Sequence, residues 1–538
     1  MRSPVGRVPV LWLSVFAGLL LAGAGCGLGQ TGIDPPMDEI FWPAGLAIDP
    51  IDGNWLYVVN SNNDLRFNAG TLLAIDLQKA KSDQTKLAAD GVASAWSECS
   101  TTHFTDDTAA ETLAGTSDEF CCFDLLRPHV LNCNERAYVR ADATVQIGSF
   151  GGGASIQTYQ EDPNDPDSEL VRRIFMIVRA EPSITFVDVT HSNGSVHMRC
   201  NGPRQDADPQ LANPFCDDNW RVRRPGGAAV TDDVFPEEPH ALALDQEMGI
   251  LYVGHLTITA AGQTVGGGIS TIDIGRPVDP RTPNVIIGGL VDPQAPNVIN
   301  SIARVVFPTS AVQGVTALTL NDPGNPSGVL YAVARASADV TGMVLQCQAT
   351  GQHCDVNDPD SRDLSLVPGE QIMSSVFLPS GTDVRGFLLS PDGTPQAYVL
   401  HRNTPESSTS SDPAALVVLD RRPNQNGEPA NTPSAILEVC SGATHMQFPP
   451  AGRGNLLYIT CFEGGQIYVV DPQSPRVVAI IEAGNGPTAL TFSPTDPNVA
   501  FVASYADNNV SVIDIEPGSP TRYMVVQRLG FPHADTTQ

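Results

Sequence analysis

The chain has 538 residues and a formal net charge of −30, with 48 glycines, 44 prolines and only 17% charged residues. Its three lysines, Lys79, Lys81 and Lys86, all lie in one segment. Such an acidic chain opposes binding to nucleic acids or anionic lipid headgroups, whereas it permits cationic partners and divalent ions.

The first 25 residues have the layout of a secretory signal peptide. Two arginines precede an apolar stretch over 8–22, and small residues then lead to Cys26. The apolar run is too short for a spanning helix, and no stop-transfer sequence follows it. The triplet that ends at Cys26 resembles a bacterial lipobox, although Gly23 stands where leucine is usual. This resemblance implies a lipidated Cys26, and the alternative is an ordinary cleavable signal.

Removal of residues 1–25 takes away two arginines and no acid, so the charge falls from −30 to −32. Residues 26–41 then form the lipidated N-terminus and a short tether. Gly27 in place of aspartate favours the outer membrane, by analogy with lipoprotein sorting. We expect a lipid-anchored protein of a bacterial cell envelope that contacts the membrane through its anchor alone.

Between residues 42 and 530, one pattern of short strands recurs seven times. Each copy has an apolar strand with a central aromatic residue, and six of the seven continue with a strand that ends in aspartate. The aromatic residues are Tyr57, Phe175, Tyr252, Tyr331, Tyr398, Tyr458 and Phe501. Period-two alternation predicts strands, and Pro-Asp and Asp-Gly pairs predict turns. We therefore predict an all-β, seven-bladed β-propeller of four-stranded antiparallel blades.

The intervals between the aromatic residues shrink from 118 residues at the start to 43 at the end. The early blades must therefore carry long loop insertions, the largest over about 77–140 with a short helix in 77–95. We place further insertions between fourth and first strands at 201–237, 284–312 and 96–140. Insertions between second and third strands are expected at 256–267 and 402–413. These insertions would thicken one face, where a rigid scaffold gathers its binding residues. Residues 531–538 form a tail.

The stretch 457–494 resembles the YVTN-type, YncE-like β-propeller repeat. The matching segments are 57–60, 458–460, 467–471, 484–487, 493–494 and 510–514. The resemblance implies a seven-bladed propeller, and a binding or scaffold role more often than catalysis.

Apart from Cys26, the chain has ten cysteines, an even number that predicts disulfides in an oxidising compartment. Sequence proximity suggests the pairs Cys200–Cys216, Cys347–Cys354 and Cys440–Cys461. The remaining four lie in the largest insertion: Cys99, Cys121, Cys122 and Cys133. Those four would form two bridges of open connectivity, in which the adjacent pair does not bond to itself. A zinc site is the alternative for this cluster.

Two acidic stretches, 161–169 and 355–363, offer clustered carboxylates of the kind that Ca²⁺ requires. The candidate ligands are Asp162, Asp165, Asp167, Asp355, Asp358 and Asp360. The alternative is a pair of solvated turns, and no other cofactor is expected.

The first strand of each blade enters the propeller axis near its start, so residues at that point line the channel mouth. Alignment of these strands places six residues at comparable positions: Ala44, His240, Thr316, Arg385, Thr444 and Thr488. A histidine and an arginine there can bind a carboxylate or hold a metal, or they can simply line a hydrated channel.

Standard hydrolase and nucleotide-binding motifs do not occur in the sequence, so no catalytic residue is assigned. The leading hypothesis is a non-enzymatic binding or scaffold protein whose loop-rich face meets an envelope protein or a surface glycan. The alternative is a lactonase-like or other hydrolase with an axial site that uses a metal. It rests on analogy of fold alone.

Overall fold

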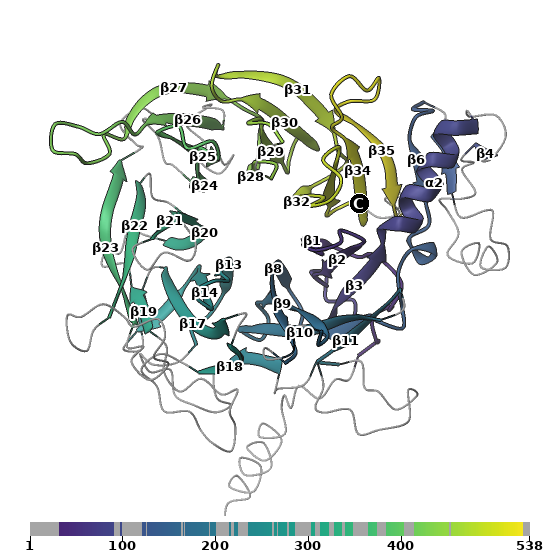
Figure 1. Cartoon of the computed structure of the whole chain (residues 1–538), viewed down its shortest axis with the longest axis horizontal. Coiled ribbons are helices and arrows are strands. Elements are labelled where there is room, and N and C mark those ends of the chain that lie inside the picture. Colours follow the sequence, from purple (N-terminus) through teal and green to yellow (C-terminus); the bar gives the residue numbers. More distant parts are fainter. Residues whose placement is uncertain are drawn as a thin grey trace, which may run out of the picture.

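The computed structural model arranges seven antiparallel sheets as the blades of a ring (Figure 1). It describes residues 32–530 apart from short gaps and the longer ones 91–96, 99–120, 201–214, 224–234, 286–302, 307–312, 322–327, 348–363, 374–382 and 403–413. Several predictions lie outside the described residues: the signal segment 1–25, Cys26, Cys99, Cys354, Asp355, Asp358, Asp360 and the tail 531–538.

Each blade is continuous in sequence, and the strands of a blade run outward from the axis in chain order. Blade 1 is β1 (Pro43–Ile48), β2 (Trp55–Asn60), β3 (Gly70–Asp76) and β7 (Val145–Ile147). Blade 2 is β8 (Gly151–Gln160), β9 (Leu170–Val178), β10 (Ser183–Ser192) and β11 (Ser195–Arg199), with β12 (Arg221–Arg223) beside β10. Blade 3 is β13 (Pro239–Asp245), β14 (Ile250–His255), β17 (Gly268–Arg276) and β18 (Asp279–Val285), with β19 (Ala303–Val306) beside β17.

The remaining four blades have four strands each of their own. Blade 4 is β20 (Gln313–Asn321), β21 (Val329–Arg335), β22 (Asp339–Cys347) and β23 (Leu364–Met373). Blade 5 is β24 (Asp383–Leu389), β25 (Gln396–Arg402), β26 (Ala415–Asp420) and β27 (Thr432–Glu438). Blade 6 is β28 (Ala443–Gln447), β29 (Leu457–Cys461), β30 (Gln466–Asp471) and β31 (Arg476–Glu482). Blade 7 is β32 (Pro487–Phe492), β33 (Val499–Ser504), β34 (Asn509–Asp514) and β35 (Met524–Leu529).

The strand pattern confirms the predicted seven-bladed propeller. All seven aromatic strands are second strands of blades, and the strands that end in aspartate are third strands. Second strands such as β2, β14 and β29 are buried along their whole length, because neighbouring blades cover both of their faces. The outermost strands β27 and β31 alternate between exposed residues and half-buried or buried ones, as strands with one solvated face do.

The largest insertion closes the ring, and its position corrects one prediction. It joins β3 to β7, so it connects third and fourth strands rather than a fourth and a first strand. The sequence pattern misplaced it because β7 has only three residues. The described parts of the insertion are α2 (Leu77–Asp90), β4 (Ser97–Glu98), β5 (Cys121–Phe123), β6 (Leu131–Cys133) and the 3₁₀ turn η2 (Glu135–Ala137). The predicted helix is present as α2.

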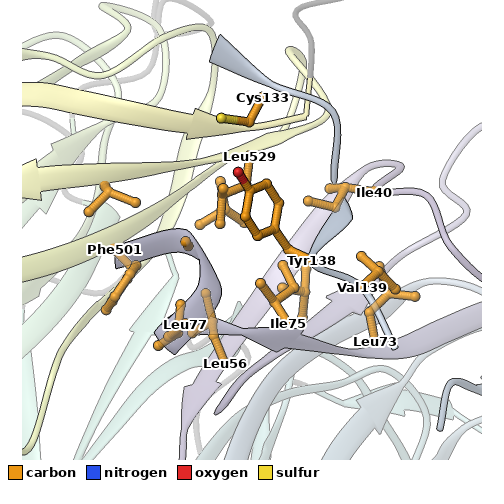
Figure 2. Close-up of a cluster of buried hydrophobic side chains, with 14 of the residues drawn as sticks. Ile40, Leu56, Leu73, Ile75, Leu77, Cys133, Tyr138, Val139, Phe501 and Leu529 are labelled. Atoms are coloured by element: carbon orange, nitrogen blue, oxygen red, sulfur yellow. The ribbon is translucent and has the colours of Figure 1, made fainter. Parts of the chain in front are cut away.

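Strand β6 pairs in parallel with β35, the outermost strand of blade 7. Strands β5 and β4 extend the same sheet, so part of blade 1 covers the edge of blade 7 (Figure 1). Figure 2 shows the hydrophobic cluster beneath this closure, in which Ile40, Tyr138, Phe501 and Leu529 come together from both ends of the chain. Covering an exposed strand edge in this way protects it from pairing with other chains.

Three disulfides join described cysteines: Cys121–Cys133, Cys200–Cys216 and Cys440–Cys461. The last two are pairs suggested by sequence proximity, and Cys122 is disulfide-bonded as well. The zinc alternative for the cysteine cluster is wrong for Cys121 and Cys133, because their sulfurs are bonded to each other. The partner proposed for Cys347 lies outside the described residues.

In at least four blades, the residue three places after the blade aromatic fastens the segment that enters the same blade. Four blades do this with different chemistry: Asn60 Oδ1 with the Phe41 amide (3.1 Å), His255 Nδ1 with the Glu237 carbonyl (3.1 Å), the Cys440–Cys461 disulfide, and the Ser504 hydroxyl with the Ala483 carbonyl (3.0 Å). The predicted disulfide between Cys440 and Cys461 is therefore one form of a recurring contact.

Candidate functional site

The six aligned channel-mouth residues all sit at irregularities in the pairing of the innermost strands. In blade 5, for example, Val384 pairs with His401 and Gly386 pairs with Leu400, which leaves Arg385 unpaired between them. The same interruption falls at each of the other five positions: Ala44, His240, Thr316, Thr444 and Thr488. A β-bulge of this kind redirects the bulged side chain, so the aligned residues are equivalent in the fold.

Blade 2 has the corresponding interruption at Gly152 and Gly153, between the pairs Gly151–Val178 and Ala154–Met176. The sequence did not reveal it, because this innermost strand lacks the apolar pattern of the others. A Cβ on Gly45, in the neighbouring innermost strand, would lie 2.3 Å from the Gly152 carbonyl oxygen. Blades 1 and 2 therefore pack backbone against backbone near the axis.

The bulged threonines are occupied with structural contacts. The Thr316 hydroxyl donates to the Val384 carbonyl of blade 5 at 2.8 Å, and the Thr488 hydroxyl donates to the Pro43 carbonyl of blade 1 at 3.2 Å. Thr444 bonds to Thr460 within its own blade at 3.1 Å. Two of the predicted binding residues thus hold neighbouring blades together, and His240 and Arg385 are the ionisable groups of the set.

His240 lies in strongly positive surroundings. Burial and the charges of Arg179, Arg385 and Arg335 lower its pKa to about 3, so the ring is neutral at ordinary pH. The Arg385 guanidinium donates to Asp383. Its own pKa is lowered by burial and by nearby Arg402 and Arg335, and Asp383 opposes that shift. Arginines from three blades therefore influence one another at the channel mouth.

A second set of equivalent residues surrounds the channel mouth, and the alignment of first strands did not include it. Each is the fourth residue after its blade aromatic, where the second strand leads into the third. In blade order they are Ser61, Arg179, Leu256, Arg335, Arg402, Phe462 and Tyr505. We call these seven residues the axial rim. The constant spacing from the aromatic residue was a usable signal in the sequence.

The rim residues carry ion pairs on one side and aromatic contacts on the other. Arg402 Nη2 lies 3.0 Å from Glu463, and Arg179 Nη2 lies 3.9 Å from Glu238. Tyr505 is the centre of an aromatic group, with its ring centroid 5.1 Å from that of Trp42 and 6.1 Å from that of Phe462. The rim is therefore cationic at blades 2, 4 and 5, apolar at blade 3 and aromatic at blades 6 and 7.

Among the described residues, the one group of three metal-ligating side chains is Asp49, Asp52 and His191. His191 Nδ1 lies 3.4 Å from Asp49 and 3.5 Å from Asp52, and His191 Nε2 lies 3.0 Å from the Tyr57 hydroxyl. Arg172 Nε donates to the same Asp49 carboxylate at 2.7 Å. This guanidinium would repel a cation, so the group is a buried ion-pair network between blades 1 and 2.

The acidic stretch 161–169 forms the turn between β8 and β9, on the face opposite the rim. Asp165 Oδ1 accepts from the Asp167 amide at 3.0 Å, and the Asp162 carbonyl accepts from the Asp165 amide at 3.0 Å. These contacts fit a solvated turn that caps itself. Calcium binding there stays a prediction.

A cavity of about 360 Å³ lies between α2 and blade 7. Its wall includes apolar residues of both, such as Ala80, Phe501 and Val512, and the Lys81–Asp496 ion pair of 2.6 Å. The cavity is next to the closure of the ring and away from the rim. No helix in the described part of the chain is long and apolar enough to cross a membrane.

Comparisons with known proteins add no functional information. No family model matches the chain, and no curated protein matches its sequence. A hydrazine synthase structure from Kuenenia stuttgartiensis is 12% identical with a TM-score of 0.45, over 92% of this chain and 99% of that chain. Chaetomium thermophilum Sqt1 is 12% identical with a TM-score of 0.40, over 93% and 88%. A functionally unknown protein from Desulfotomaculum acetoxidans is 8% identical with a TM-score of 0.36, over 72% and 87%.

Proposed function

We propose that this chain is a non-enzymatic binding protein of the YVTN-type propeller class, anchored in a bacterial outer membrane through a lipid on Cys26. Its partner is an envelope protein or a surface glycan, which it meets on the face that bears the axial rim. The lipobox-like N-terminus, the disulfides and the acidic composition all suit an extracytoplasmic compartment.

The observation that carries the proposal is the shared location of the rim and the insertions. The connections between β14 and β17 and between β25 and β26 open on the rim face, as do those between blades 2 and 3 and between blades 3 and 4. These connections contain the predicted insertions 201–237, 256–267, 284–312 and 402–413. The largest insertion is the exception, because it joins a third to a fourth strand and so opens on the opposite face. A rigid ring with several long connections on one face is still a common arrangement for recognition.

The charge around His240 favours binding over metal-dependent hydrolysis at the axis. A catalytic metal ion requires several acids and histidines to converge. Here the histidine is next to the charges of Arg179, Arg335 and Arg385, which oppose a divalent cation. The same charges attract an anionic group of a partner.

Site-specific photo-crosslinking in intact envelopes tests this proposal. A crosslinking residue at Arg66, in the exposed loop after β2 on the rim face, should trap a discrete partner. The matched control is Asn426, in an exposed turn after β26 on the opposite face. Equal adducts from both positions, or none from either, would contradict recognition through the rim face.

A further inference from the structure

The axial rim carries two arcs with different chemistry, and Ser61 of blade 1 and Leu256 of blade 3 belong to neither. Blades 2, 4 and 5 contribute Arg179, Arg335 and Arg402, and blades 6 and 7 contribute Phe462 and Tyr505. We propose that the rim binds an acidic saccharide, with the sugar carboxylate on the arginine arc and the sugar ring on the aromatic arc. This inference rests on the proposed function, since it names the partner class of the same face.

Arg335 is the rim arginine that no described acid pairs with. Its side chain is exposed at the end of β21. A guanidinium presents parallel N–H donors that match the two oxygens of a carboxylate, so Arg335 is suited to bind that group directly. The charge of Arg335 reaches both Arg385 and His240, which places it among the groups at the channel mouth.

Two further arginines offer donors and acceptors side by side. Arg385 is paired with Asp383, and Arg402 is paired with Glu463. Three buried atoms of these pairs, Asp383 Oδ1, Arg385 Nε and Arg402 Nε, have no hydrogen-bond partner among the described residues. A sugar hydroxyl both donates and accepts, so a row of such pairs matches neighbouring hydroxyls better than it matches a simple anion.

The aromatic arc is continuous with the arginine arc. The Tyr505 ring contacts those of Trp42 and Phe462. Burial raises the pKa of Tyr505 to about 12, and the charge of Arg179 opposes this shift. Flat rings beside a cationic arc provide an apolar surface for the C–H face of a sugar whose acidic group lies on the arginines.

The acids at the rim argue against a more highly charged ligand. Asp383, Glu463 and Glu238 each accompany a rim or channel arginine, and the whole chain has a net charge of −30. A phosphodiester chain with one charge per nucleotide would meet strong repulsion away from the arginines. One carboxylate per sugar ring is compatible with this mixed surface.

Calorimetric titration of the mature full-length protein with oligogalacturonate tests the inference. The matched probe is the same oligomer with its carboxylates methyl-esterified, which should not bind. R335A should weaken binding by about tenfold. R335K should retain part of the affinity, because lysine keeps the positive charge but lacks the parallel N–H donors of the guanidinium. The control is R422A, which removes a 77% exposed arginine from the opposite face and should change the affinity by less than about twofold.

Equal affinities for R335A and R422A would overturn the rim as the site, and binding of the esterified oligomer would overturn the role of the carboxylate. Tighter binding of single-stranded DNA than of the uronate would overturn the ligand class. Unfolding midpoints for each variant separate a lost site from a lost fold. If the parent protein does not bind the uronate although crosslinks at Arg66 form, this inference alone is contradicted, whereas absence of those crosslinks contradicts the proposed function.

Discussion

The Cys440–Cys461 disulfide provides the sharpest test of how entering segments are held. The two cysteines are 21 residues apart in sequence, and their exposed fractions are 5% and 0%. Chain entropy for a loop of this length gives a stabilisation of about 3 kcal/mol. We therefore expect the double substitution Cys440→Ala/Cys461→Ala to weaken the attachment of the segment that enters blade 6 by that amount.

A second variant separates the covalent bond from the contact that it replaces. In Cys440→Ala/Cys461→Ser, the hydroxyl can bond the entering backbone as Ser504 does in blade 7, which should recover about 1 kcal/mol. The assay is native-state hydrogen exchange, because a chain of this size is not expected to unfold in two states.

The informative amides are those of Val439 and Phe462, which donate to the carbonyls of Ala414 and Gly442 at 2.8 and 2.9 Å. If both variants exchange at the parental rate, within about 0.5 kcal/mol, the fastening role of this position is refuted.

Two other predictions concern buried charges and pH. Arg172→Met leaves the fully buried Asp49 carboxylate without its guanidinium, so it should lower the protection of neighbouring amides against native-state hydrogen exchange by about 3–5 kcal/mol. Arg172→Met/Asp49→Asn should recover part of this protection. Burial is the main cause that lowers the pKa of His240 to about 3 and of His401 to about 4. Between these values and about pH 6.5, both histidines are therefore protonated in the unfolded chain and neutral in the folded one. Stability from these groups is present above about pH 6.5 and is lost as the pH falls toward 4, by up to about 1.4 kcal/mol per pH unit for each. His401→Asn should reduce the slope of stability against pH below about pH 6.5 by the share of one histidine, up to about 1.4 kcal/mol per pH unit. A slope equal to that of the parent would contradict the reasoning.

The repeat made the second and third strands predictable, since each has an apolar run with a fixed aromatic residue or a terminal aspartate. First strands were predictable in the blades with a clear apolar pattern, and their alignment located the bulge positions from the amino-acid sequence alone. The bulge of blade 2 was not predicted, because it consists of Gly152 and Gly153, which have no side chain to align. The hydrogen bonds of Thr316 and Thr488 were not predicted either, because they are made to backbone carbonyls of other blades.

The closure of the ring depends on contacts that no local pattern specifies. Strand β6 has three residues and pairs with β35, which lies almost 400 residues later in the chain. Nothing in a segment of that length distinguishes a strand from a loop, and its sheet forms only when blade 7 is in place. The sequence supported an insertion with a helix and disulfides, and the parallel pairing is a property of the assembled ring.

Two adjacent positions after the blade aromatic are under different constraints. The third residue fastens the entering segment in at least four blades, and each solution is chemically different because only the contact is required. At the fourth position the recurring contact to the entering segment is made by the backbone: the amides of four rim residues, Ser61, Leu256, Phe462 and Tyr505, donate to carbonyls of that segment. A backbone hydrogen bond does not dictate which side chain the residue carries. Arginine makes up 27 of the 538 residues, yet it fills three of the seven rim positions, and the two aromatic rim residues are in adjacent blades. A clustering of side-chain types that packing does not require is best explained by a ligand that meets both arcs at once.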